Sequence, residues 1–374
     1  MNDRKSRITI YDVARETGLA PSTVSNALAG KGHVSEKSRL LVQEAATRLG
    51  YRALPLARAL RLQRSFTIGV LIADIANPAF PDFVRGVEDV VVREKCTLLL
   101  CNTDGQEASQ IEQMDALGDR GVDGIVLISQ HTRSPEIRQR LQAGPPFVLV
   151  QRRSAGFEDD YVGSDNAGAI EAAVRHLAGL GHSRIAFVRG PVESSTALER
   201  LDAFRQAVVG FGLDPDPQLI YPGDYSMASG YQAAMLLLNS RHPPTAIIAS
   251  DDMNALGIME AAHRLRAPIP QRLSVIGFDD ITLASFGRID LTTIHLPKRD
   301  MGRAAAELLV RRIAGDRHEP ARLIMFPTQL VIRGSTGPAP AWQEALARGR
   351  EAENGVEASV SASAASAGGL SPRG

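Results

Sequence analysis

Two pairs of adjacent acidic residues, Asp251–Asp252 and Asp279–Asp280, lie in or directly after the apolar runs TAIIAS and LSVIGFD. Paired carboxylates can exchange protons as general acid and base, or they can hold the hydroxyl groups of a sugar. The sequence contains no G-x-G-x-x-G, G-x-x-x-x-G-K-[ST], H-E-x-x-H or G-x-S-x-G motif, and its eight histidines are scattered. We therefore expect no catalytic residues and interpret the acid pairs as candidate ligand-binding groups.

Short polar side chains gather at the front of a second stretch, PSTVSNALAG, which covers residues 21–30. Proline, serine and threonine favour a helix start there, and Val24 and Leu28, four residues apart, give the helix one apolar face. Such a helix can bring its polar groups to the phosphates and base edges of DNA. These groups are Ser22, Thr23, Ser25 and Asn26.

A helix before this stretch and another after it complete a three-helix unit. YDVARETG ends at Gly18, and EKSRLLVQEAATRLGY is expected to place Leu41, Ala45 and Leu49 on one side. The tight turn at 18–20 fits a helix-turn-helix, whose second helix enters a major groove of DNA. The alternative is a helical hairpin whose serines merely cap the helix.

Charge is unevenly spread along the chain, although its 374 residues are formally neutral overall. Residues 1–65 hold 12 Lys and Arg against 5 Asp and Glu, whereas the remainder holds 30 against 37. A basic head on an acidic body indicates that only the head meets a polyanion. A solvated charged surface is the alternative.

The cysteines and the N-terminal sequence exclude several classes of protein. Cys96 and Cys101 give no disulfide framework, and without paired histidines they fall short of a zinc site. The start of the chain lacks the apolar region of a signal peptide, and no window approaches a transmembrane span. We expect a cytoplasmic protein without membrane contact, metal or cofactor.

From Phe66 onwards, apolar runs of strand length alternate with helical stretches. The first series of runs is FTIGVLIAD, TLLLCN, GIVLIS and FVLVQR. The rhythm restarts after residue 160 with YVGSD, RIAFVRG, TAIIAS and LSVIGFD, and with helices at 166–180, 196–210, 229–239 and 252–265. Two such series predict two similar α/β lobes with parallel sheets, and a ligand cleft beyond the carboxyl ends of the strands.

The stretch ITIYDVARETGLAPSTVSNALAGKGHVSEKSRLLVQEAATRLGY is followed by DIANPAF, GVDGIVLIS, VGSDNAGA, LGHSRIAFVRGP, ERLDAF, PTAIIASDDMNALGI, LSVIGFDD and LTTIHLPKRDMG. Together these motifs resemble the lactose/galactose-repressor (LacI/GalR) family of bacterial transcription regulators. The likeness covers residues 8–333 in order and at family spacing. It implies an N-terminal all-α helix-turn-helix domain and a two-lobed α/β core like that of periplasmic binding proteins. It also implies a homodimer that binds double-stranded DNA at a palindromic operator.

The resemblance divides the chain into four parts. Residues 1–53 form the helix-turn-helix domain, 54–65 the hinge, and 66–335 the effector-binding and dimerisation core. Residues 336–374, rich in Pro, Gly, Ala and Ser without an apolar period, are expected to be a disordered tail. An oligomerisation helix is the alternative for this tail, with Leu346 as its one strong seam residue.

The family's DNA-contact positions fall on Thr9, Tyr11, Ser22, Thr23, Ser25, Asn26 and His33. The hinge LPLARALRLQR corresponds to a short helix that forms on the operator. The resemblance implies that Ala57 approaches the minor groove, Arg58 meets phosphates, and Leu60 wedges apart a central base step. Two departures from the family pattern are Leu54, where a polar residue is usual, and Ala29, where asparagine is frequent.

The family's effector positions fall on Asn77, Phe80, Gln151, Arg152, Thr196, Arg200, Tyr225, Asp251 and Asp279. Carboxylates, amides and arginines suit the hydroxyls of a sugar, although a nucleobase could use much of the same set. Phe80 and Tyr225 could equally be ordinary packing residues. Gln151 stands where many relatives have aspartate, so one polar contact is neutral in this chain.

Together these features predict a cytoplasmic DNA-binding regulator, most simply a repressor. A small-molecule effector, a sugar or sugar derivative, would bind between the lobes and modulate operator affinity. Two alternatives from other classes remain open. One is a cytoplasmic small-molecule-binding protein without DNA activity, and the other is a sugar-modifying α/β enzyme.

Overall fold

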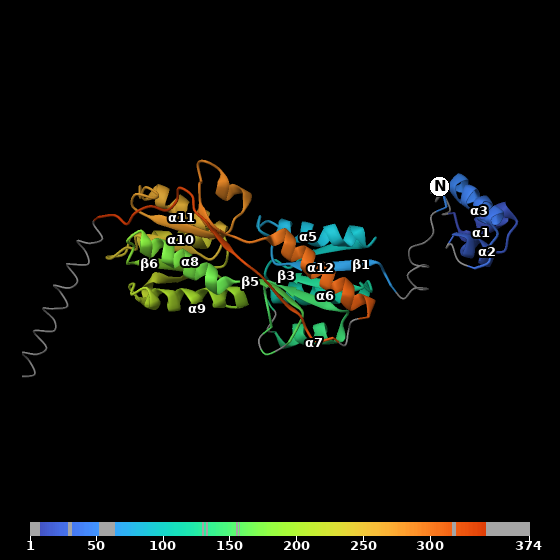
Figure 1. Cartoon of the computed structure of the whole chain (residues 1–374), viewed down its shortest axis with the longest axis horizontal. Coiled ribbons are helices and arrows are strands. Elements are labelled where there is room, and N and C mark those ends of the chain that lie inside the picture. Colours follow the sequence, from blue (N-terminus) through green and yellow to red (C-terminus); the bar gives the residue numbers. More distant parts are fainter. Residues whose placement is uncertain are drawn as a thin grey trace, which may run out of the picture. The chain divides into compact units, whose positions relative to one another are not determined.

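The computed structural model describes residues 8–28, 32–51, 64–128, 131, 134–154, 156, 158–315 and 319–341. They fall into two compact units, divided between Thr67 and Ile68. The N-terminal unit is all-α, and the larger unit combines helices with two sheets (Figure 1). Each unit has a hydrophobic core of its own.

Helix-start and helix-stop residues set the limits of the N-terminal helices. The backbone N–H of Thr9 and its hydroxyl both donate to the Asp12 carboxylate, which fixes the first turn of the first helix. Gly18 ends that helix with a φ of 67°, a left-handed conformation that glycine adopts without strain. The three predicted helices are confirmed as α1 (Ile10–Thr17), α2 (Pro21–Leu28) and α3 (Glu36–Leu49).

Small and β-branched side chains fill the core between these helices. Ala45 is buried as predicted, but the prediction for Leu41 is wrong, because 45% of its surface is exposed. Val42, the next residue, is buried instead, since the inward face of α3 follows a three- and four-residue spacing from Val42. The core comprises Val13, Ala14, Val24, Ala27, Val42, Ala45 and Ala46.

The larger unit has two lobes, and the first is built on a six-stranded sheet in the order β11-β5-β4-β3-β1-β2. The pairs β1–β3, β3–β4, β4–β5 and β5–β11 are parallel. Its strands are β1 (Thr67–Ile72), β2 (Thr97–Asn102), β3 (Gly124–Ile128), β4 (Phe147–Val150), β5 (Tyr161–Ser164) and β11 (Leu323–Phe326). Its helices are α5 (Phe80–Arg93), α6 (Glu107–Asp119), α7 (Pro135–Ala143) and α12 (Lys298–Ala314).

Alternation along the strands buries both faces of this sheet. Val70, Val126 and Val148 belong to the apolar cluster that includes residues of α5 and α12. Their neighbours Leu71 and Leu127 belong to the cluster that includes residues of α6 and α7. The near-continuous apolar runs in the sequence therefore reflect a sheet that is covered by helices on both sides.

The second lobe has a six-stranded sheet in the order β12-β10-β9-β8-β6-β7, in which only the described pair β10–β12 is antiparallel. Its strands are β6 (Ile185–Arg189), β7 (Ile220–Pro222), β8 (Ala246–Ala249), β9 (Ser274–Asp279), β10 (Thr292–His295) and β12 (Gln329–Val331). Its α-helices are α8 (Asn166–Gly179), α9 (Ser195–Gly210), α10 (Met227–Leu238) and α11 (Asp252–Arg264). Two short 3₁₀ helices, η1 (Pro217–Leu219) and η2 (Thr282–Ser285), complete it.

The chain crosses between the lobes after β5, after β10 and after β11. As a result α12 and β11 complete the first lobe although they follow the second in sequence. The two-lobed α/β architecture is confirmed, but assigning YVGSD to the second series is wrong. β5 pairs with β4 in the first sheet, and the crossing follows it at Asp165.

Helices α5 and α12 touch backbone to backbone at two glycines. A Cβ atom added to Gly86 would lie 2.0 Å from the carbonyl oxygen of Arg299, and one added to Gly302 would lie 2.1 Å from that of Phe83. These distances are far below van der Waals contact, so neither position has space for a methyl group. The two glycines therefore set how closely the helices pack.

We expect Gly302→Ala to lower the free energy of unfolding of the full chain by about 1–3 kcal/mol. The added methyl group forces the two helices apart, and this overpacking outweighs the gain of up to ~1 kcal/mol in helix propensity. Gly118→Ala in α6 is the matched control, because a Cβ there meets no atom within 4 Å. The control is expected to be neutral or stabilising. Urea unfolding followed by circular dichroism measures both, and equal midpoints for the two variants would contradict the prediction.

Candidate functional site

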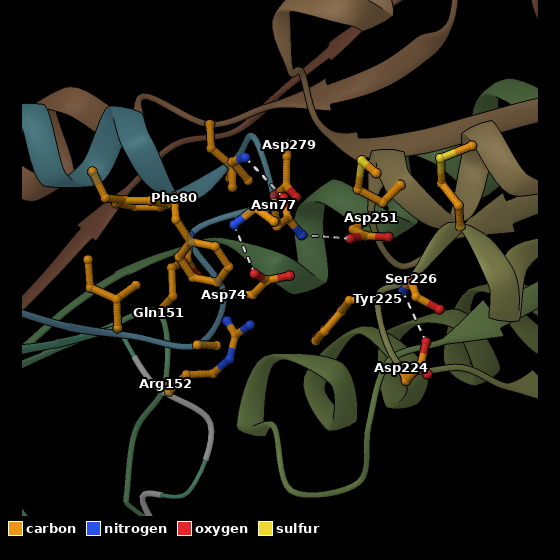
Figure 2. A pocket seen from close by; sticks show the side chains of 18 of the residues that line it. Asp74, Asn77, Phe80, Gln151, Arg152, Asp224, Tyr225, Ser226, Asp251 and Asp279 are labelled. Carbon is orange, nitrogen blue, oxygen red and sulfur yellow. Dashed lines mark hydrogen bonds between the residues drawn. The ribbon is translucent and has the colours of Figure 1, made fainter. Parts of the chain in front are cut away.

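A cavity of about 290 Å³ lies between the two lobes, beyond the carboxyl ends of their strands. Figure 2 shows Phe80, Gln151 and Arg152 on one side and Tyr225 and Asp251 on the other. The residues that line it are Ala73, Asp74, Ala76, Asn77, Ala79, Phe80, Phe83, Ile128, Gln151, Arg152, Arg200, Asp224, Tyr225, Ser226, Met227, Asp251, Met253, Asp279 and Leu296.

This cavity brings together most of the residues that the sequence singled out. Eight of the nine expected effector residues line it, and Thr196 does not. Thr196 is fully buried, and its hydroxyl lies 3.0 Å from that of Ser194, which in turn lies 3.1 Å from the Tyr225 hydroxyl. Thr196 therefore lies behind the cavity wall and reaches the cavity only through Ser194 and Tyr225.

Of the hydrogen bonds that join the two lobes, one is formed between two residues that line the cavity. Nδ2 of Asn77, in the loop after β1, donates to Oδ2 of Asp251 over 3.2 Å (Figure 2). The loop is held by its own side chains, because the Ala76 N–H donates to Asp74 and the Ala79 N–H donates to Asn77. This turn leads directly into α5, whose first residue, Phe80, forms part of the wall.

Arg200 is a buried cation whose described acceptors are neutral. Its Nε donates to Oδ1 of Asn166 over 2.9 Å, and one terminal nitrogen donates to the carbonyl oxygen of Ser250 over 2.5 Å. Its guanidinium carbon lies 3.4 Å from the centre of the Phe278 ring. Burial lowers the pKa of Arg200, and the nearby acidic groups oppose that shift. The guanidinium is therefore fixed in orientation while its charge is not matched by a carboxylate hydrogen bond.

Arg152, from the segment after β4, is the second cation at the cavity wall. Only 8% of its surface is exposed, and its buried Nε finds no hydrogen-bond partner in the described part of the chain. Its guanidinium lies 5.5 Å from the centre of the Tyr225 ring. A buried donor without an acceptor is costly, so a movement of the Arg152 side chain that brings this Nε to a ligand oxygen is favourable.

Two carboxyl groups face these cations. Asp251 begins α11, where one of its oxygens accepts the Asn254 N–H over 2.8 Å. Burial raises the pKa of Asp251 well above its usual value, and the negative charge of Asp279 raises it further. Burial also raises the pKa of Asp279, while Arg200 opposes the shift. Carboxyl groups held in this way can accept hydrogen bonds from hydroxyl groups. When protonated, they can also donate a hydrogen bond.

The other members of the two acid pairs serve the framework. Asp252 accepts the Ile281 N–H over 2.8 Å and the Thr293 hydroxyl over 2.6 Å, and burial raises its pKa to about 8. Asp280 lies 2.6 Å from a terminal nitrogen of Arg333 and 2.9 Å from Nδ1 of His295. Neither residue lines the cavity.

Gln151 is in the wall, but its amide is turned into the protein. The amide and the Ser164 hydroxyl form two hydrogen bonds with each other, over 3.1 and 3.2 Å. The amide nitrogen also lies 3.8 Å from the sulfur of Met301. The Gln151 backbone has a φ of 61°, which is uncommon outside glycine. The cavity wall therefore has a neutral side chain, bonded to its own lobe, at Gln151.

Several lining residues were not singled out from the sequence. Asp74 follows the first strand and could have been identified, because the same argument from strand ends selected Asp251. Asp224 and Ser226 follow β7, a strand of three residues, which leaves no apolar run to recognise. Met227 and Met253 sit at helix starts in apolar surroundings, where packing is the ordinary interpretation.

The expected DNA-contact residues lie on the N-terminal unit. Ser22 and Asn26 are exposed on α2, four residues apart and hence on one face, while Val24 on the same helix is buried. Tyr11 is 65% exposed on α1, and His33 is exposed before α3. Thr23 and Ser25 are partly buried, and Thr9 caps α1. Ala29, Ala57, Arg58 and Leu60 lie outside the described residues.

The residues that the structure describes offer neither a metal site nor a membrane-spanning helix. No group of three or more His, Cys, Asp or Glu side chains among them is arranged to hold a metal ion. None of the helices in these ranges combines the length and the apolar character that crossing a bilayer takes.

Comparison with known proteins gives matches over both units. Residues 9–53 match the family described as "Bacterial regulatory proteins, lacI family", and residues 174–336 match "Periplasmic binding protein-like domain". The chain is 35% identical over 329 residues to the ribose operon repressor of Escherichia coli (strain K12), which covers 87% of this chain and 99% of that protein.

Two solved structures are similar to the chain as well. A lac repressor dimer bound to operator and the anti-inducer ONPF matches with a TM-score of 0.79 and 26% identity, covering 89% of this chain and 100% of that one. A transcriptional regulator from Enterococcus faecium with bound ribose matches with a TM-score of 0.66 and 30% identity, covering 73% and 99%. Both matches extend over the two lobes that enclose the cavity.

Proposed function

The chain belongs to the LacI family of bacterial regulatory proteins, and we propose that it is a repressor whose operator affinity is set by a sugar or sugar derivative bound between its lobes. As a member of that family it is a DNA-binding transcriptional regulator. It acts on operator DNA and hence in the cytoplasm.

The observation that carries the effector proposal is the set of unmatched polar groups around the cavity. Arg152 offers a buried donor without an acceptor, Arg200 is bonded only to neutral described acceptors, and Asp251 and Asp279 face them. A ring of adjacent hydroxyls donates to carboxylates and accepts from guanidinium groups at the same time. Phe80 provides an apolar surface for the face of a sugar ring. We assign the effector site to these five residues with Asn77, Gln151 and Tyr225.

Ribose is the first compound to test. The ribose operon repressor is 35% identical to this chain, and the ribose-bound Enterococcus faecium regulator matches over both lobes. The neutral amide of Gln151, bonded to Ser164, removes one charged contact from the wall. We therefore expect a small uncharged sugar, and a nucleoside as the second class, because the aromatic side chains Phe80 and Tyr225 could stack on a base.

The N-terminal unit supplies the DNA-binding surface of this proposal. The exposure of Ser22 and Asn26 on one face of α2 supports their entry into a major groove, and the exposure of Tyr11 supports contact with a phosphate. Thr9, Thr23, Ser25 and His33 are assigned to the same surface. A two-fold homodimer, like the lac repressor dimer on its operator, matches a palindromic site. Ala57, Arg58 and Leu60 of the hinge are assigned to the centre of that site.

The experiment that tests this function first selects an operator sequence and then measures which small molecule changes the affinity of the protein for it. Random duplexes are selected on the full chain, and the enriched sequence is compared with its scrambled version at one salt concentration. We expect at least roughly 10³-fold tighter binding to the selected duplex. Ribose, other sugars and nucleosides are then added in turn, and one of them should change that affinity.

The outcomes separate the three classes of protein that the sequence left open. Equal affinity for selected and scrambled duplexes, with a sugar bound in calorimetry, would identify a small-molecule-binding protein without operator specificity. A sugar converted to a new product would identify an enzyme. The names of the relatives, which are regulators, favour neither of these outcomes.

A further inference from the structure

Lys298 is a buried cation at an unfavourable position. It is the first residue of α12, and only 3% of its surface is exposed. Lysine is rarely buried, and a positive charge at a helix N-terminus opposes the helix dipole. Both costs require a compensating interaction. Lys298 has one in the second lobe, because its Nζ donates a short hydrogen bond to the backbone carbonyl of Asp279.

This hydrogen bond connects the two lobes. Helix α12 is part of the first-lobe core through Met301 and Ala305, whereas Asp279 ends β9 of the second lobe. The crossing after β10 lies between these two residues in sequence. His295, the last residue of β10, pairs with Asp279, so Lys298 lies three residues beyond the partner of Asp279 and its side chain makes the contact back across the crossing. Asp279 has a φ of 113°, a conformation that is strained outside glycine. The ammonium group of Lys298 stabilises the carbonyl orientation that this backbone produces.

Helix α12 extends the connection to the opposite wall of the cavity. Helix α12 packs so closely on α5 at Gly86 and Gly302 that neither position has space for a Cβ atom. Helix α5 carries Phe80 and Phe83, which line the cavity from the first lobe. The carboxyl group of Asp279 lines it from the second. A continuous chain of contacts therefore runs from one wall to the other through Lys298.

We propose that Lys298 is a positioning residue, which links cavity residue Asp279 of the second lobe to the α12–α5 helix pair of the first lobe. A role of Lys298 in the effector response rests on the proposed function of the cavity. Its role in holding the two lobes in one arrangement does not require a ligand. A sugar that touches the Asp279 carboxylate thereby acts on a residue whose backbone is already tied to the other lobe.

The first test measures the distance between the lobes in the full chain without ligand. Cys96 and Cys101 are replaced by serine, and spin labels are placed at the exposed positions Glu88 on α5 and Gln232 on α10. The labelled chain is mixed with an excess of unlabelled chain, so that few dimers carry labels on both protomers. Double electron–electron resonance should then give one narrow distance distribution for the parent. Lys298→Met, similar in length but without a donor or charge, should broaden it at least twofold.

Arg299→Met is the matched control for this test. It removes a cation from the next residue of the same helix, but Arg299 pairs with Asp89 of α5 inside the first lobe. Its distribution should equal that of the parent. Lys298→Arg, which keeps the charge and the donors, should restore the narrow distribution. If circular dichroism shows that Lys298→Met is unfolded, Lys298→Gln takes its place. A parental distribution in the folded variant would overturn the proposal.

The second test uses D-ribose as the probe and measures its affinity from pH 5 to pH 8. Lys298 lowers the pKa of the Asp279 carboxyl, so its removal raises that pKa. On acidification, ribose affinity should then be lost at a higher pH in Lys298→Met than in the parent or Arg299→Met. The charged groups around Asp279 are Arg152, Arg200, Asp251, Asp252 and Lys298.

The two tests fail in distinguishable ways. If D-ribose does not bind the parent, the proposed effector class is wrong for this probe, while the distance measurement still decides the role of Lys298. If D-ribose binds and its pH profile is unchanged in Lys298→Met, Lys298 does not position the carboxyl group of Asp279, and the proposal is overturned at that point.

Discussion

Replacing Arg200 by methionine should weaken binding of the effector by about 100-fold and leave operator binding close to that of the parent. The variant has an unbranched side chain of similar bulk, but it removes the guanidinium group that lies over the Phe278 ring and with it every donor. Hydrogen bonds to a charged group contribute up to ~3 kcal/mol, which corresponds to roughly 100-fold in affinity.

The loss of charge acts in the same direction. Arg200 lowers the pKa of both Asp251 and Asp279, so without it both carboxyl groups hold their protons to higher pH. The cavity then loses ionised acceptors together with the donors. Operator binding is unaffected in this prediction, because the DNA-contact residues belong to the separate N-terminal unit.

Arg205→Met on the same helix is the matched control. Arg205 is exposed and pairs with Asp202 outside the cavity, so this variant should bind and respond like the parent. Calorimetry with the compound that changes operator affinity measures binding, and gel-shift titration measures the response. If Arg200→Met binds that compound as tightly as Arg205→Met does, the effector site lies elsewhere.

The framework of the cavity could be predicted from strand ends. The runs TAIIAS and LSVIGFD are strands β8 and β9, and Asp251 and Asp279 stand at their carboxyl ends because parallel strands end at one edge of a sheet. The same reasoning places Gln151 and Arg152 after β4. Local apolar periodicity was sufficient here, since each strand is continuous and buried.

Contacts between distant parts of the chain could not be predicted in this way. The sequence near Lys298 does not indicate that its ammonium group meets the Asp279 carbonyl, because this contact forms only when the chain has crossed from β10 to α12 and Lys298 lies beside the end of β9. Thr196 shows the converse, because its position one residue into α9 turns it behind Ser194 and away from the cavity. Side-chain direction at a helix start depends on tertiary packing rather than on residue type.

Removing residues 1–67 should abolish DNA binding while effector binding is kept. The first 65 residues hold 12 Lys and Arg against 5 Asp and Glu, whereas the remaining chain holds 30 against 37 and is repelled by a polyanion. The deletion ends where the two compact units divide, so the shortened chain of residues 68–374 keeps its own hydrophobic core.

For the full chain we expect a steep dependence of operator affinity on salt. Each phosphate that a Lys or Arg neutralises contributes a slope of about −0.9 to the plot of log affinity against log salt. A dimer with two basic heads that contacts roughly 6–10 phosphates should lose about 10³-fold or more between ~50 and ~200 mM salt. Fluorescence anisotropy with a labelled operator measures this slope. Calorimetry on the shortened chain shows that the effector still binds and hence that the lobes are folded.

The salt dependence of operator affinity in the full chain, compared with DNA binding by residues 68–374, decides which unit binds the DNA. A steep slope that disappears with residues 1–67 locates the phosphate contacts on the N-terminal unit, as the charge distribution requires. A flat slope for the full chain would mean that few phosphates are neutralised, and the basic head would then be a solvated surface. Residual operator binding by residues 68–374 would locate contacts on an acidic body, which contradicts the electrostatic argument for a separate DNA-binding unit.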